Sequence, residues 1–306
     1  MSNRLAVEIA GLKLSNPTML AAGILGLSGA SLREVAEKGA GALVTKSVCM
    51  KPRVGYANPT IVQVDCGLLN AIGLANSGAP DFAEEIRELK NDGLSVPLIA
   101  SVFGFSSEEF AKAARILTRA GANAVELNVS CPHVERTGSE IGQNPALVAD
   151  VVKNVKGAVD KPVIVKLTPN VADIVEVAGA AVKAGADAVV AINTVRAMAI
   201  DVETAKPILA NTIGGLSGSA IRPIAVRCVY ELYESVKVSI IGCGGISNWQ
   251  DAVEFMLAGA SAVQVGTAIA SEGLGVFKSI TRGVDSYIRR KGFRSVKEIV
   301  GLSHRR

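Results

Sequence analysis

The stretch Gly185-Ala186-Asp187-Ala188-Val189-Val190-Ala191-Ile192-Asn193 decides the fold, because its pattern occurs four times along the chain. The other three copies begin at Gly39, Gly121 and Gly259, and each follows a segment with helical periodicity. The leading glycine is typical of a helix end, and the continuous apolar run after it is typical of a parallel strand buried on both faces. The repeat therefore predicts a recurring unit of helix, turn and buried strand.

Four further apolar runs lie between these copies and bring the expected number of strands to eight: residues 18–22, 97–101, 163–167 and 238–242. Amphipathic segments separate them, at about residues 31–38, 80–90, 107–119, 145–157, 171–184, 219–235, 248–257 and 275–291. Eight strands alternating with helices predict an α/β fold, a closed (β/α)8 TIM barrel, as a single domain of residues 1–306. An open doubly wound sheet is the alternative, but no GxGxxG motif follows the first strand.

Two connections, residues 47–80 and 194–219, are long for a compact barrel, and loops of that length usually cover a site. Near the amino terminus, residues 5–7 and 13–14 are expected to form a hairpin that closes the bottom of the barrel.

Composition and charge exclude several classes of function. The net charge is +4, and basic residues are scattered among acids, so no nucleic-acid partner is expected. No run of about 18 uncharged apolar residues occurs, so no membrane span is expected. Cysteine is present five times without CxxC spacing, at Cys49, Cys66, Cys131, Cys228 and Cys243. An odd count of this kind predicts neither a disulfide framework nor a zinc site and fits the reducing cytoplasm.

In a barrel of this kind, the active site lies at the carboxyl ends of the strands. The residues expected there are Ala22, Gly23, Lys46, Ser101, Asn128, Lys166, Asn193, Thr194, Gly244, Gly245, Gly266 and Thr267. This set offers neither the two acids of a glycosidase nor the ligands of a metal hydrolase, so no metal is predicted. Two lysines among amides, hydroxyls and glycines suit a large, flat, anionic cofactor that forms hydrogen bonds.

Three glycine-rich segments, residues 214–218, 242–246 and 266–267, are expected on the same side of the barrel. One such segment alone is as compatible with a tight turn as with a ligand. Three together predict a phosphate held by backbone N–H groups. Lys46 and Lys166 each end a buried strand, where an ammonium needs an anionic partner unless its side chain extends into solvent.

The segment Asn128-Val129-Ser130-Cys131-Pro132-His133 places a thiol just after a buried strand, ahead of a proline that stops regular structure. Such a position favours chemistry over packing. Spacing alone leaves a buried structural thiol equally open.

Five motifs in this order resemble those of dihydroorotate dehydrogenases, and the resemblance extends over nearly the whole chain. They are Asn70-Ala71-Ile72-Gly73-Leu74, Asn128-Val129-Ser130-Cys131-Pro132, Val165-Lys166-Leu167-Thr168-Pro169-Asn170-Val171, Ile192-Asn193-Thr194 and Gly214-Gly215-Leu216-Ser217-Gly218. The cysteine at position 131 resembles class 1, and the first and last motifs resemble the catalytic subunit of subclass 1B.

The resemblance implies an FMN enzyme that oxidises (S)-dihydroorotate to orotate in pyrimidine biosynthesis, with Cys131 as the base for the C5 proton. The implied FMN contacts are Ala22, Gly23, Lys46, Ser47, Ser101, Asn128, Lys166 and Ile192, with the phosphate at Gly218, Gly244, Gly245, Gly266 and Thr267. The implied orotate contacts are Lys46, Asn70, Ala71, Ile72, Gly73, Leu74, Asn128, Asn193 and Thr194.

Subclass 1B also implies a partner subunit that carries FAD and a [2Fe-2S] cluster and passes electrons to NAD+, within a homodimer or a heterotetramer. This chain has neither cluster-spaced cysteines nor a dinucleotide motif, so use of NAD+ would require that partner. At the positions of Ala22, Ser101 and His133, many relatives have a different residue. His133 resembles dihydropyrimidine dehydrogenase, so a subunit acting on uracil or thymine is the alternative enzyme. A flavin-free phosphate-binding barrel, acting as an isomerase or a regulatory subunit, is the alternative of a different class.

Overall fold

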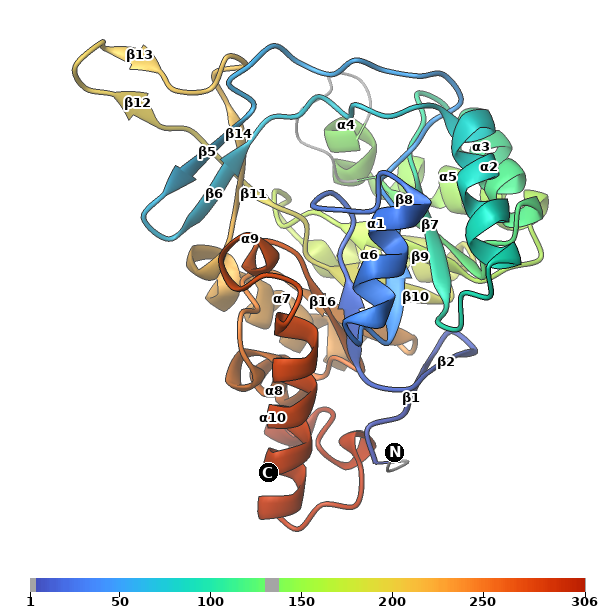
Figure 1. The fold of residues 1–306 in the computed structure, drawn as a ribbon, viewed down its shortest axis with the longest axis vertical. Coiled ribbons are helices and arrows are strands. Elements are labelled where there is room, and N and C mark those ends of the chain that lie inside the picture. The colour runs from blue at the N-terminus through green and yellow to red at the C-terminus, as the bar shows by residue number, and fades with distance from the viewer. Residues whose placement is uncertain (1–3, 130–137, 306) are drawn as a thin grey trace.

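The computed structural model describes residues 4–129 and 138–305, and within this part eight parallel strands close into a barrel (Figure 1). Around the barrel the strands are β3 (Thr18–Leu20), β4 (Ala42–Val44), β7 (Leu98–Val102), β8 (Ala124–Asn128), β9 (Val163–Leu167), β10 (Ala188–Ala191), β15 (Ser239–Cys243) and β16 (Ala262–Val265). Every strand pairs in parallel with its neighbours, and β16 pairs with β3 to close the ring. The predicted (β/α)8 barrel is confirmed.

Helices follow the strands and pack around the barrel (Figure 1). They are α1 (Gly29–Glu37), α2 (Ala79–Asn91), α3 (Ser107–Arg119), α5 (Pro145–Ala158), α6 (Ile174–Lys183), α7 (Arg222–Ser235), α8 (Trp249–Ala258) and α10 (Val276–Arg290). All eight predicted helices are present. Two short ones were not predicted, α4 (Gly138–Gln143) and α9 (Ala268–Glu272), nor were the 3-10 turns η1 (Ser219–Ile221), η2 (Val296–Glu298) and η3 (Leu302–His304).

Local sequence explains why these helices begin and end where they do. The Ser106 hydroxyl accepts a hydrogen bond from the Glu109 N–H at the start of α3, and Arg119 lies in the last turn, where a cation suits the helix dipole. The buried face of α3 includes Phe110 and Leu117, which lie about two helical turns apart. Each barrel helix therefore buries one apolar stripe against the strands.

A hairpin of β1 (Val7–Ile9) and β2 (Leu12–Leu14) precedes the barrel, two residues further along the first segment than the sequence predicted. Its side chains Val7, Ile9 and Leu14 are buried in the main core. In Figure 1 this hairpin lies at the end of the barrel away from β5 (Ile61–Val64) and β6 (Gly67–Asn70). The predicted closing hairpin is confirmed.

The two long connections were expected to cover a site, and residues of both line the cavity described below, but they also contain strands that were not predicted. They form an antiparallel sheet in the order β11-β14-β6-β5, which adds β11 (Val195–Ala197) and β14 (Gly214–Ser217) to β5 and β6. A second, two-stranded arm of β12 (Ile200–Asp201) and β13 (Lys206–Pro207) extends from it (Figure 1). Leu69, Ala71 and Leu209 form a small separate core for this sheet. The connections therefore carry a folded cover rather than irregular loops.

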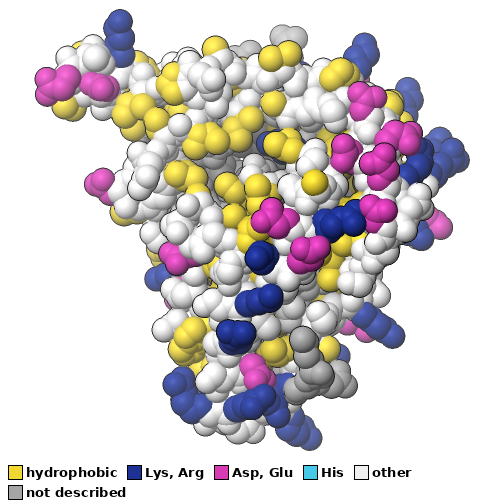
Figure 2. Space-filling model, viewed as in Figure 1, with side chains coloured by type: hydrophobic (Ala, Val, Ile, Leu, Met, Phe, Trp, Pro, Cys, Tyr) yellow, Lys and Arg dark blue, Asp and Glu magenta, His cyan; other side chains and the backbone are white. Residues whose placement is uncertain are grey.

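The surface shows both signs of charge next to each other, as Figure 2 illustrates for one face. In the part of the chain that the structure describes, no helix is long and apolar enough to cross a bilayer.

Candidate active site

A cavity of about 610 Å³ lies at the carboxyl ends of the barrel strands, with the β5–β6 hairpin and Ser217 of β14 on its outer side. Its volume falls within the usual range of about 300–1,000 Å³ for small-molecule and cofactor sites. Most of the residues predicted for a site line it together: Ala22, Gly23, Lys46, Ser47, Asn70, Ile72, Gly73, Leu74, Asn128, Lys166, Ile192, Asn193, Thr194, Gly218, Gly244, Gly245, Gly266 and Thr267.

Two predicted contact residues do not line this cavity. Ser101 is fully buried, and its hydroxyl lies 2.8 Å from that of Ser47, so it contacts the cavity wall only from behind. Ala71 packs in the small core of the covering sheet. Cys131 and His133 fall outside the described residues.

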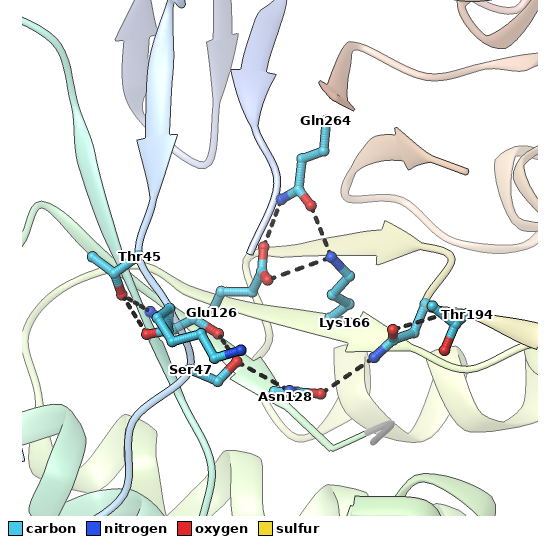
Figure 3. A network of polar contacts seen from close by, with 10 residues as sticks. Thr45, Ser47, Glu126, Asn128, Lys166, Thr194 and Gln264 are labelled. Carbon is cyan, nitrogen blue, oxygen red and sulfur yellow. Dashed lines mark hydrogen bonds and ion pairs between the residues drawn. The ribbon is translucent and has the colours of Figure 1, made fainter. Parts of the chain in front are cut away.

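Two asparagines at the mouth are fixed by a chain of hydrogen bonds (Figure 3). The Asn193 amide nitrogen donates to Asn128 Oδ1 at 3.4 Å, and the Asn128 amide nitrogen donates to the Ser47 hydroxyl at 3.0 Å. Asn193 Oδ1 accepts from the Thr194 N–H at 2.8 Å. These bonds fix the orientation of both amide side chains, which line the cavity.

Charged and polar side chains meet on the inner wall, where Lys166 of β9, Gln264 of β16 and Glu126 of β8 form a triangle (Figure 3). The Lys166 ammonium donates to Gln264 Oε1 at 3.0 Å and lies 3.9 Å from Glu126 Oε1. The Gln264 amide nitrogen donates to Glu126 Oε2 at 2.6 Å. Sequence reasoning missed Glu126 and Gln264. A signal was present, because each is a polar residue within an otherwise apolar strand.

Lys166 remains charged despite its position. Burial lowers the pKa of its ammonium, but the acidic neighbours Cys243 and Glu126 outweigh burial and hold that pKa above the usual lysine range. Burial raises the pKa of the Cys243 thiol, which keeps that group neutral near pH 7. Glu126 is the carboxylate that pairs with Lys166 in this buried site.

At the other end of the cavity, the backbone turns sharply at three glycines. Gly218, Gly244 and Gly245 have φ angles of 102°, 134° and 72°, a region that side chains with a Cβ rarely adopt. A Cβ on Gly245 would lie 2.6 Å from the Gly218 carbonyl oxygen, so this packing requires glycine there. The Thr267 hydroxyl, just before α9, donates to the Ser217 hydroxyl at 2.8 Å. Closely packed backbone of this kind suits a phosphate group.

No cluster of three or more His, Cys, Asp or Glu side chains with the geometry of a metal site occurs among residues 4–129 and 138–305. The donors in the cavity are nitrogen and hydroxyl groups that suit a planar organic ligand and a phosphate.

Comparison with known proteins adds an independent line of support. The family model described as "Dihydroorotate dehydrogenase" matches residues 4–288. The protein called "Dihydroorotate dehydrogenase B (NAD(+)), catalytic subunit" of Methanosarcina acetivorans is 52% identical over 97% of this chain and 95% of its own length. The proteins of the same name from Pyrococcus abyssi and Methanothermobacter thermautotrophicus are each 52% identical over 98% of this chain, covering 99% and 98% of their own lengths. The barrel, the cavity at its strand ends and these matches together show that the chain belongs to the dihydroorotate dehydrogenase family.

Proposed function

We propose that this chain binds FMN and oxidises (S)-dihydroorotate to orotate in pyrimidine biosynthesis. The observation that carries the proposal is a single cavity that joins glycine turns at one end, a lysine on the inner wall and oriented amides at the mouth. The names of the relatives agree with this activity.

The residues fit FMN at both ends of that molecule. The glycine turns at Gly218, Gly244 and Gly245, with Thr267, would hold the phosphate. Ala22, Gly23, Lys46, Ser47, Asn128, Lys166 and Ile192 would surround the ring system. Ser101 would act on it only through Ser47. When bound, FMN supplies the acceptor for the hydride that leaves C6 of the substrate.

The substrate is a small pyrimidine ring with a carboxylate, and the chain offers groups for each part. Asn128 and Asn193 line the cavity as amides of fixed orientation, while Asn70 is held by its own bond to the Gly215 carbonyl at 3.1 Å. Lys46 lines the same cavity and provides a cation for the carboxylate. The backbone of residues 70–74 would complete the pocket, with Ala71 supporting it from the covering sheet.

Oxidation also requires a base for the C5 proton, and the sequence provides Cys131 for that role. Amides cannot accept this proton, whereas a thiolate can. Lys166 would place its positive charge where negative charge gathers during hydride transfer. The carboxylate Glu126 does not line the cavity and is not a candidate for the base.

Substrate choice tests the proposal directly. The purified chain should contain FMN, identified by its absorption spectrum, and should reduce an artificial electron acceptor with dihydroorotate but not with dihydrouracil. We expect orotate to form in step with acceptor reduction. Exclusive use of dihydrouracil would show instead the dihydropyrimidine dehydrogenase type of activity, and a protein without flavin absorption would favour the flavin-free barrel.

Replacing Gly245 with alanine should lower the FMN content of the purified protein by roughly tenfold or more, because the added Cβ meets the Gly218 carbonyl oxygen and the Arg222 side chain. Gly292→Ala is the matched control, since Gly292 also has a positive φ, of 77°, but its Cβ would meet nothing within 4 Å. The control should keep full FMN content and show only a small loss of stability. Equal FMN content in both variants would contradict a phosphate site at Gly245.

We also propose that electrons pass to NAD+ through a partner subunit carrying FAD and a [2Fe-2S] cluster, and that the chain works in the cytoplasm as a homodimer or within a heterotetramer. The words "catalytic subunit" in the names of the relatives support a partner. Free thiols at Cys49, Cys66, Cys228 and Cys243 suit a reducing compartment. The chain alone should therefore reduce a dye but not NAD+.

A further inference from the structure

The interior of the barrel contains a charged layer where such barrels usually have none. Barrel interiors are mostly filled by valine, isoleucine and leucine. Here β8, β9 and β16 bring Glu126, Lys166 and Gln264 into contact, with 0%, 5% and 1% of each residue exposed. Removing two charges from water costs more than their attraction usually returns, so a gain in stability does not account for this triangle. Its position beneath the cavity indicates a functional reason.

The triangle has an inner and an outer side. Lys166 and Gln264 line the cavity, whereas Glu126 lies behind them and does not. Gln264 is oriented by both partners, since its nitrogen donates to Glu126 and its oxygen accepts from Lys166. Within residues 4–129 and 138–305, Glu126 Oε1 is buried without a hydrogen-bond partner, and its polar interaction is the ion pair with Lys166. Glu126 can therefore influence a bound cofactor only through Lys166 and Gln264.

This inference rests on the proposed function. We propose that Glu126 is a positioning residue which, together with Gln264, keeps Lys166 charged and directed toward the cofactor cavity.

The neighbours of Lys166 support this role. On the adjacent strands, Val190 of β10 is apolar, while Asn128 of β8 is a neutral amide bonded to Ser47. The other titratable groups around the same cavity are Cys243, whose pKa burial raises, a second cation, Lys46, and Asp65, Cys66 and Glu272. Within the described residues, the ion pair of Lys166 is with Glu126 and not with Asp65 or Glu272. In the part of the chain that the structure describes, Glu126 is thus the carboxylate that pairs with Lys166. Without it, Cys243 alone would oppose the effect of burial on the pKa of Lys166, and a neutral thiol carries no charge with which to do so.

Thermal or denaturant unfolding of the full chain at several pH values tests this without reference to FMN. In Glu126→Gln the folded chain should release the Lys166 proton, whereas the unfolded chain keeps it. Because the unfolded chain then binds more protons than the folded chain, low pH favours unfolding. We call the factor by which the folding equilibrium constant of a variant falls below that of wild type its deficit. The deficit of Glu126→Gln should therefore shrink by at least about tenfold as the pH rises from about pH 6 to about pH 9. A deficit that stays constant with pH would overturn the proposal.

Two variants serve as controls. Glu126→Asp keeps the negative charge and should show a constant deficit across this range. Asp187→Asn removes a carboxylate that also pairs with a lysine, Lys156 at 2.9 Å, but this pair is half-exposed and lies outside the cavity. It should also show a constant deficit, which separates the loss of an ion pair from the specific change at Lys166.

The reduction potential of bound FMN provides the second measurement. In Glu126→Gln, Lys166 should take up an additional proton on reduction, so the potential should fall more steeply with pH than in wild type. The expected extra change is at least tenfold in the ratio of reduced to oxidised protein, about 30 mV for a two-electron couple. Parallel pH dependence in the two proteins would overturn the role of Glu126. A chain that binds no FMN would refute the proposed function, while the unfolding measurements would still decide on Glu126.

Discussion

Cys131→Ser should bind FMN normally but oxidise dihydroorotate about 10²- to 10⁴-fold more slowly near pH 7, the usual effect of losing a general base. A cysteine thiol has a reference pKa of about 8.5, and nearby cations or donors can bring its thiolate within reach of neutral pH. A serine hydroxyl is a far weaker acid and does not ionise there. The rate of the variant should rise as the pH is raised, because hydroxide or an ionised alkoxide can then remove the C5 proton.

The measurement is turnover with an artificial acceptor, together with the flavin absorption of each protein. Cys228→Ser is the matched control, since Cys228 is a free thiol in α7 that does not line the cavity. It should keep turnover close to that of wild type. Undiminished turnover in Cys131→Ser would remove Cys131 from the mechanism.

The barrel could be predicted because each strand carries its own local signal. The residues that precede β8 and β10 include Gly121 and Gly185, with φ angles of 120° and 107°. Few residues other than glycine adopt such angles, so the glycine marks the helix end in the sequence itself. The continuous apolar run that follows reflects burial of the strand on both faces. Fold class, strand positions and the cavity residues at the strand ends follow from these two signals.

The covering sheet could not be predicted in the same way, because its pairing is not local. Asn70 of β6 bonds to Gly215 of β14 across 145 positions of the chain. The glycines of β14 are unfavourable for a strand on their own, but here they allow close packing, since a Cβ on Gly214 would lie 2.6 Å from the Asn70 carbonyl oxygen. Local patterns suggest a flexible glycine segment at this place, and only the partner strand reveals its conformation.

Glu126 and Gln264 could not be predicted as site residues for a different reason. Each lies within a predicted strand whose other residues are apolar, and sequence alone does not say which partners meet inside a closed barrel. Gln264 bonds to Lys166, 98 positions away in the sequence, and to Glu126, 138 positions away. The sequence therefore predicts a site at the strand ends, whereas the charged layer beneath them can be recognised only from the structure of the closed barrel.

Lys166→Met should be the variant with the largest loss of stability, about 3–5 kcal/mol in the free energy of unfolding, because it leaves Glu126 as a buried charge without its cation. Methionine has a similar length, so lost volume contributes little. Turnover should also fall by about 10²- to 10³-fold, since a positive charge at the cavity wall is lost. Denaturant unfolding near pH 7 measures the first effect and acceptor reduction the second.

The stability loss should be measured between about pH 6 and about pH 9, where wild-type Lys166 contributes its full stabilisation. The folded-state pKa of Lys166 lies above its usual value, so the stabilisation that it provides is fully present below the unfolded value of about 10.4 and is lost only as the pH rises beyond it. The double variant Lys166→Met with Glu126→Gln removes both charges and leaves amides that can bond to each other. It should recover most of the stability while turnover remains low. If instead the two losses simply add, Lys166 and Glu126 do not act as a pair, and the charged layer is not what holds the lysine in place.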